Sequence, residues 1–107
     1  SPEARAVTSL MICNIPCWVA TEDLAEVIGR LGYDFGGSWD FLYIPSSGGG
    51  SSSVRYAFIN FCSASVATSF SVAFADYTFT GPQGPCRPCE VKPARIQGKE
   101  ELVRQSR

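Results

Sequence analysis

The chain has 107 residues, of which 45% are hydrophobic and 18% are charged, and its formal net charge is −1. This length fits one domain with its own core, and the composition excludes a disordered or fibrous chain. No apolar run approaches the roughly 20 residues of a membrane-spanning helix, and the amino terminus has no signal-peptide pattern. Because the chain begins with Ser1 and Pro2 rather than Met, we expect a monomeric domain of a longer protein.

Charge is distributed unevenly along the chain. Acidic side chains predominate in residues 22–40, and basic side chains predominate in residues 87–107. This polarity predicts one basic surface that faces an anion, and an acidic helical side that faces solvent or a protein partner. The five cysteines, an odd number without secretory features, favour free thiols in a reducing, intracellular compartment.

Two elements are expected in the first third of the chain. The apolar run 10–15 ends before a proline and predicts a strand. Thr21 offers a hydroxyl to cap a helix, and acidic side chains follow near its positive end. Apolar residues then recur at helical spacing until Gly32, which predicts the end of the helix.

The middle of the chain predicts two strands and a connection. Residues 39–44 are rich in aromatic and branched side chains and predict a second strand. Residues 46–53 contain only Gly and Ser, which predicts a flexible loop. Residues 54–61 alternate between two kinds of side chain and predict a third strand.

The last part of the chain predicts a helix, a loop, a strand and a short helix. Ser63 is a plausible cap for a second helix, whose apolar stripe runs to Phe74. Residues 77–88 are rich in Pro and Gly and predict a loop, with a short extended piece expected at Tyr77–Thr80. Residues 89–95 predict an edge strand, because they contain a proline that lacks an N–H group, and residues 99–104 predict the trailing helix.

This order of elements predicts a ferredoxin-like α+β sandwich. Its βαββαβ arrangement places two helices on one face of a four-stranded antiparallel sheet, with a short extra helix at the carboxyl end. We expect a flexible flank at residues 1–9, the domain at residues 10–97 and a helical extension at residues 98–107. The helices bury one face of the sheet, so the other face is open.

Side chains of the third strand are divided between these faces. The set expected under the helices is Ala57, Ile59 and Phe61, and the set expected on the open face is Val54, Tyr56, Phe58 and Asn60. Neighbouring aromatic rings on an open face are unusual unless something stacks on them. Unpaired RNA bases stack on rings arranged in this way.

The third strand, "VRYAFINF", resembles the longer ribonucleoprotein octamer at every position after the first two, if Ile59 is accepted for valine. "LMICNI" resembles the shorter hexamer of the first strand. The segments "MICNIP", "WDFLYIP", "YAFINF" and "ARIQGKEELV" resemble the C-terminal RNA-recognition motif of the Mei-two-like meiosis-regulator family. This resemblance covers most of the chain, from about Leu10 to Val103.

The resemblance implies single-stranded RNA binding and a role in RNA fate during meiosis or development, in nucleus and cytoplasm. The rings of Tyr56 and Phe58 are expected to stack bases, with Met11 as a softer platform where other motifs have an aromatic. The remaining RNA-binding residues are expected to be Asn14 and Asn60 for base edges and Arg55, Lys92, Arg95 and Lys99 for phosphates. Val54 replaces the basic first residue of the octamer, and Arg55 either restores that charge or points into solvent.

A second reading remains open at this point. The trailing helix or a partner protein could cover Tyr56 and Phe58, which would make the chain a protein-interaction module with a blocked RNA face.

Zinc binding and catalysis have little support in the sequence. Cys86 and Cys89 have the C-x-x-C spacing of a zinc ligand pair, and Cys13 or Cys17 could complete a set. One such pair without histidine is weak evidence, so we predict no metal and no other cofactor. The chain has no histidine, catalytic carboxylate pair or phosphate loop, so we predict no enzyme.

Overall fold

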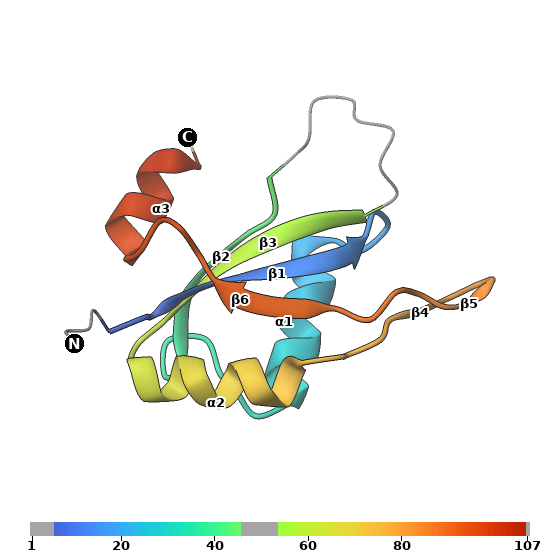
Figure 1. The fold of residues 1–107 in the computed structure, drawn as a ribbon, viewed down its shortest axis with the longest axis horizontal. Coiled ribbons are helices and arrows are strands. Elements are labelled where there is room, and N and C mark those ends of the chain that lie inside the picture. The colour runs from blue at the N-terminus through green and yellow to red at the C-terminus, as the bar shows by residue number, and fades with distance from the viewer. Residues whose placement is uncertain (1–5, 46–53, 107) are drawn as a thin grey trace.

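Four strands form one antiparallel sheet in the computed structural model, which describes residues 6–45 and 54–106. In sheet order they are β2 (Trp39–Tyr43), β3 (Val54–Phe61), β1 (Ser9–Pro16) and β6 (Glu90–Pro93) (Figure 1). This arrangement confirms the predicted ferredoxin-like α+β fold. The expected Gly/Ser loop at 46–53 and the first five residues of the expected amino-terminal flank lie outside the described residues.

Helices lie on both sides of the sheet, but they cover it unequally. The described residues contain three helices, α1 (Thr21–Arg30), α2 (Ala64–Phe74) and α3 (Lys99–Gln105). The first two bury one face of the sheet, whereas α3 lies on the other side, against β2 (Figure 1). Among the described residues, no helix is both long and apolar enough to cross a bilayer.

Local hydrogen bonds set the helix boundaries. The Ser63 hydroxyl accepts a first-turn backbone N–H at 3.3 Å, which confirms the predicted cap of α2. In α1 the cap residue is Ala20, whose N–H donates to the Asp23 carboxylate at 3.0 Å. The prediction of Thr21 as the cap is therefore wrong by one residue, because a carboxylate on the first turn satisfies the exposed donor. Gly32 ends the helix with a φ of 102°, as predicted.

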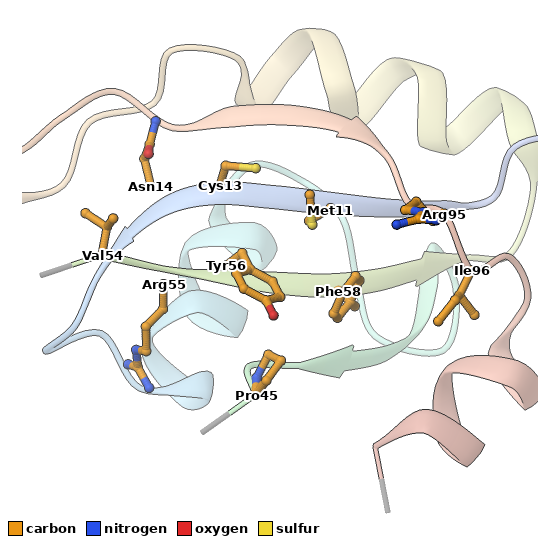
Figure 2. Close-up of a pocket in the computed structure, with 10 residues that line it drawn as sticks. All are labelled: Met11, Cys13, Asn14, Pro45, Val54, Arg55, Tyr56, Phe58, Arg95 and Ile96. Atoms are coloured by element: carbon orange, nitrogen blue, oxygen red, sulfur yellow. The ribbon is translucent and has the colours of Figure 1, made fainter. Parts of the chain in front are cut away.

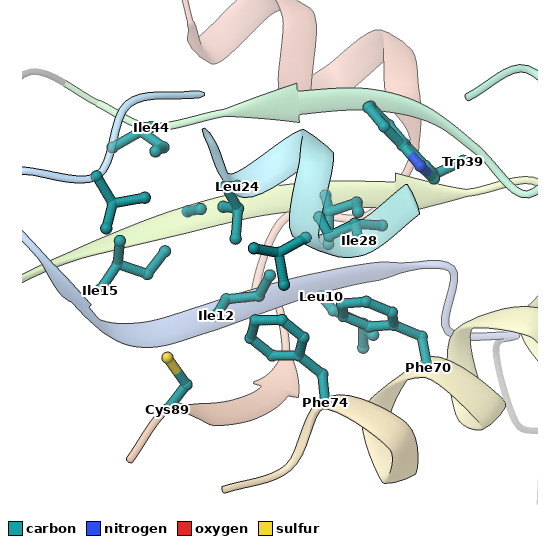
Figure 3. Packing of buried hydrophobic residues seen from close by; sticks show 14 of the residues in the cluster. Leu10, Ile12, Ile15, Leu24, Ile28, Trp39, Ile44, Phe70, Phe74 and Cys89 are labelled. Atoms are coloured by element: carbon teal, nitrogen blue, oxygen red, sulfur yellow. The ribbon is translucent and has the colours of Figure 1, made fainter. Parts of the chain in front are cut away.

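The core fills the space between the sheet and the first two helices (Figure 3). Ile12 and Ile59 point into it from the central strands, and both are fully buried. Phe70 of α2 lies 4.8 Å from Phe61 and 5.1 Å from Phe74 between ring centroids. This contact of rings across the two layers fixes α2 on one face of the sheet, so α2 does not cover the opposite face.

The predicted loop at 77–88 contains a small hairpin instead of irregular chain throughout. Its strands are β4 (Thr80–Gly81) and β5 (Gly84–Pro85), which pair with each other outside the main sheet. Gly84 has a φ of 110°, a conformation that glycine adopts without strain. The hairpin projects from the domain beyond the start of β6 (Figure 1). The loop prediction is therefore wrong for Gly81, Gly84 and Pro85, whereas Thr80 belongs to the extended piece that the sequence predicts.

Two identical substitutions test which helix surface forms the core. Val27 of α1 is buried, whereas Val72 of α2 is 75% exposed. We expect Val27→Ala to lower the free energy of unfolding by about 1–2 kcal/mol, because two buried carbon groups are removed. Val72→Ala is expected to change it by less than about 0.5 kcal/mol. Urea denaturation measures both, and equal losses would contradict the described packing.

Candidate nucleic-acid interface

The open face of the sheet contains a hollow of about 660 Å³ (Figure 2). We call it the sheet hollow. Its lining residues are Met11, Cys13 and Asn14 of β1, Pro45 after β2, Val54, Arg55, Tyr56 and Phe58 of β3, and Arg95 and Ile96 after β6. None of these residues belongs to α3. The trailing helix therefore closes one end of the open face and leaves the sheet hollow accessible.

Two aromatic rings lie side by side in the sheet hollow. Tyr56 is 46% exposed, and Phe58 is half-buried beside it. Their ring centroids are 5.5 Å apart and their planes are nearly perpendicular, at 84°. The helix-facing residues between and beyond them, Ala57 and Ile59, are fully buried, as the alternation predicts. The sheet hollow thus offers flat apolar surface to a planar ligand.

Strand register extends this surface into a row across the sheet. Phe58 is opposite Tyr43 on β2 and opposite Met11 on β1, and Met11 is opposite Lys92 on β6. Side chains directly opposite each other share a sheet face. Two rings, a thioether and an ammonium group therefore lie in one line on the open face. Tyr43 is not among the residues predicted from the sequence. Alternation within "WDFLYI" does indicate its position, because Tyr43 must face away from the side on which its neighbour Ile44 is buried.

An irregularity in β1 shapes the other end of the sheet hollow. The pairing of β1 with β3 shifts register after Ile12, and Asn14 has a φ of 67°. Asn tolerates this left-handed conformation better than most residues. The Asn14 side-chain amide donates to the Pro88 carbonyl at 3.1 Å, so it ties β1 to the segment before β6. Asn14 is still one of the residues that line the sheet hollow.

Arg55 supports a loop from within the wall of the sheet hollow. Its guanidinium donates to the carbonyl oxygens of Cys17 at 2.9 Å and Val19 at 2.6 Å. The Arg55 Nε atom is buried without a hydrogen-bond partner. The side chain therefore does not point freely into solvent, and its positive charge stays beside Val54. It fixes the loop between β1 and α1.

Asn60 belongs to a buried polar network and does not line the sheet hollow. Its Oδ1 accepts from the Ser9 hydroxyl at 2.7 Å and from the Thr8 hydroxyl at 3.0 Å, and its Nδ2 donates to Asp40 at 2.9 Å. Asn60 is only 5% exposed. The expectation that the Asn60 amide meets a base edge on the open face is therefore wrong, because its oxygen and its nitrogen both form hydrogen bonds inside the protein.

Gln97 joins this network to the trailing helix. Its Oε1 accepts the backbone N–H groups of Thr8 and Ser9, and its Nε2 donates to the carbonyls of Ser9 and Ala94. The N–H of Gly98 donates to the Ser9 hydroxyl at 2.8 Å. The chain after β6 is thereby held against the start of β1, which sets where α3 begins.

The predicted cations are only partly brought together. Arg95 is exposed and lines the sheet hollow, and Lys92 is exposed at the β6 end of the row described above. Lys99 is exposed on α3 and does not line the sheet hollow. On the same helix Arg104 pairs with Glu101 at 2.7 Å. Exposed positive charge at the sheet hollow therefore comes from the β6 side, whereas the Arg55 guanidinium on the β3 side is bonded to backbone carbonyls.

Cysteine thiols near the sheet hollow favour their neutral form. Burial raises the pKa of the Cys13 thiol, an effect that the nearby Lys92 ammonium partly offsets. Burial also raises the pKa of Cys89 to about 11, with Cys13 and Cys86 adding to the rise. Within the described part of the chain, no three His, Cys, Asp or Glu side chains are grouped to hold a metal ion.

Comparison with known proteins gives the family. The sequence matches the RNA recognition motif 2 family over residues 7–107. The chain belongs to this family. Such RNA recognition motifs are binding modules rather than enzymes, in agreement with the sequence prediction.

One curated relative of this RNA recognition motif is the protein MEI2-like 5 of Oryza sativa subsp. japonica. It is 38% identical over 96 residues, which cover 90% of this chain and 11% of that protein. The chain therefore spans about a tenth of the relative's length. This match confirms the resemblance to Mei-two-like proteins seen in the sequence.

Solved structures share the fold at lower sequence identity. The C-terminal domain of MEC-8 bound to AGCACA is 16% identical with a TM-score of 0.63, and the match covers 88% of this chain and 98% of that one. The C-terminal RNA recognition motif of the U11/U12 65K protein is 22% identical with a TM-score of 0.63, covering 89% and 76%. These likenesses establish the architecture of the RNA recognition motif.

Removal of the Gln97 amide should loosen the trailing helix. We expect Gln97→Ala to lower the free energy of unfolding by about 1–3 kcal/mol, because it leaves the part-buried backbone N–H groups of Thr8 and Ser9 without this partner. Gln105→Ala, on the exposed side of α3, is the matched control and should have little effect. Urea denaturation and hydrogen exchange of α3 amides measure both variants. Indistinguishable results would contradict the anchoring role.

Cysteine alkylation tests the described thiol environments. At about pH 8 we expect iodoacetamide to modify the exposed Cys17 and Cys62 first and Cys89 last, because Cys89 is buried and its pKa is about 11. Its thiolate fraction rises as the pH approaches that pKa, so its alkylation should accelerate from pH 8 upward. Peptide mass mapping gives the rates, with urea-unfolded protein as the control. Early modification of Cys89 in the folded protein would contradict this arrangement.

Proposed function

We propose that this RNA recognition motif binds single-stranded RNA in the sheet hollow. The bases stack on Tyr56 and Phe58, and Met11 adds a softer contact beside Phe58. The observation that carries this proposal is the accessible pair of rings on the sheet face that α1 and α2 do not cover. Every base has a flat face, so such a surface accepts many sequences.

Charge around the sheet hollow supports a defined path for the RNA backbone. Arg95 lines the sheet hollow and Lys92 ends the row of side chains, so both cations lie on the β6 side. At the opposite end Val54 stands where the octamer has a basic residue, and the neighbouring Arg55 guanidinium is already bonded to two backbone carbonyls. Phosphates therefore pass along β6, while the bases reach toward β3. This placement makes binding sensitive to salt.

The strength expected from stacking alone is limited. Two stacked bases contribute roughly 2–6 kcal/mol, which corresponds to dissociation constants from about tens of millimolar to tens of micromolar. The cations at β6 and further domains of a longer protein add to this. Asn14, which lines the sheet hollow near Tyr56, supplies a polar group to a base edge, although its amide N–H already donates to Pro88.

Two further observations favour RNA binding over a protein-interaction module whose RNA face is covered. The trailing helix lies against β2 and contributes no residue to the sheet hollow. The similar MEC-8 domain was solved bound to AGCACA, so an RNA recognition motif with this architecture holds a short nucleic-acid sequence in that protein.

The cellular role is proposed from the relative in rice. The likeness to MEI2-like 5 supports a role in regulating RNA fate during meiosis or development, in nucleus and cytoplasm, as a monomeric domain of a longer protein. Visualising the full-length protein in meiotic cells tests this role, and exclusion from both compartments would contradict it.

Substitution of the two rings tests the proposed RNA site. We expect Tyr56→Ala and Phe58→Ala each to weaken binding to a pool of short single-stranded RNAs by about 5- to 150-fold, because each removes one stacking surface. Phe35→Ala is the matched control, because Phe35 is a 70% exposed ring outside the sheet hollow. It should change affinity by less than about twofold. Fluorescence anisotropy gives the affinities, and equal binding by all variants would overturn the proposal.

A further inference from the structure

A second groove lies beside α1, and it shares no lining residue with the sheet hollow. We call it the helix groove, and its volume is about 350 Å³. One wall is a single helix face, with Asp23, Glu26, Val27 and Arg30 at helical spacing. The other wall is the segment 77–80 that leads from α2 to the hairpin, and Trp18 lies at the end near the start of α1.

Trp18 presents an exposed ring that is held in place from below. Its side chain is 51% exposed, yet it contacts the buried Phe79 edge-to-face with 6.1 Å between centroids. The hairpin also approaches it, since a Cβ atom placed on Gly81 would lie 3.5 Å from the indole. Phe79 in turn contacts Tyr77 at 5.0 Å, and Tyr77 stacks on Phe74 of the core at 5.0 Å. A continuous series of rings therefore fixes Trp18 at the surface.

Negative charge lies on the same helix face. Asp23 and Glu26 line the helix groove, and neither forms an ion pair with another residue in the described ranges. Asp23 accepts the N–H of Ala20 with one carboxylate oxygen, which leaves the other oxygen for a ligand. Arg30 stands at the far end of the helix face, so a second cation would be repelled there. The groove thus has a negative aromatic end and a positive end.

We propose that the helix groove binds an arginine-containing segment of a partner protein. The guanidinium stacks on the face of Trp18 and donates to the carboxylates of Asp23 and Glu26. Arginine fits better than lysine because its planar group stacks and donates in a fork at the same time. The same carboxylates repel phosphate, so a nucleic acid does not suit this surface. The module then holds protein and RNA on separate surfaces.

A peptide titration tests this proposal independently of RNA binding. The probe is an acetylated peptide of alternating glycine and arginine, and its control carries citrulline, the neutral isostere, in place of arginine. We expect saturable binding of the arginine peptide, followed through amide NMR shifts along the helix groove and through Trp18 fluorescence. Trp39, the other indole of the chain, is buried and should not respond.

Three variants separate the helix groove from general electrostatic attraction. Trp18→Leu is expected to weaken binding of the arginine peptide by about 3- to 30-fold. The double variant Asp23→Asn with Glu26→Gln is expected to weaken it by about tenfold or more. Asparagine retains the acceptor for the Ala20 N–H, so α1 should still begin normally. Glu22→Gln removes one negative charge from α1 outside the helix groove, half of what the double variant removes, and should weaken peptide binding by less than about twofold.

Several results would overturn the proposal. These are equal binding of the citrulline peptide, a loss from Glu22→Gln as large as that from the groove variants, shifts confined to the sheet hollow, or no saturation by about millimolar peptide. Because the probe contains no RNA, these results do not depend on the function proposed for the sheet hollow.

Discussion

Alternation of side chains along β3 is the constraint on which the rest of the structure depends. Ala57, Ile59 and Phe61 are buried beneath the helices, so the residues between them must face the other way. Shifting the strand by one residue would bury Tyr56 and expose the core. The order of the sheet then places β1 next to the rings of Tyr56 and Phe58, and β6 on the far side of β1. The interface is therefore a direct consequence of how the core is filled.

A polar network limits how much of the open face remains accessible. Asn60 would otherwise continue the exposed surface of β3, but the Ser9 hydroxyl donates to its side-chain oxygen. Ser9 in turn bonds Gln97 and the N–H of Gly98, which holds the start of α3 nearby. The glutamine of the segment "ARIQGKEELV" is Gln97, and its side-chain amide hydrogen-bonds the backbone at the start of β1, where strand pairing with β6 has ended. The trailing helix closes one end of the face, and the aromatic rings remain beyond it. The helix therefore covers part of the open face without blocking the rings.

The sequence was most informative where local periodicity decides the outcome. Strand alternation predicted the orientation of Tyr56 and Phe58, and the cap at Ser63 followed from its position before an apolar stripe. It was least informative where a side chain finds partners distant along the chain. Asn60 and Arg55 have the residue types of ligand-binding groups, yet both are engaged by backbone and side-chain groups of other segments. No local pattern reports such contacts.

Mapping RNA-induced changes onto the folded domain tests the central claim most directly. Amide NMR spectra recorded with and without a short single-stranded RNA report which strands and helices change their surroundings. The account predicts the largest shifts on β1, on β3 around Tyr56 and Phe58, and near Arg95, with small shifts on α1 and α2. Shifts concentrated on those two helices, or none on β3 at saturating RNA, would contradict it.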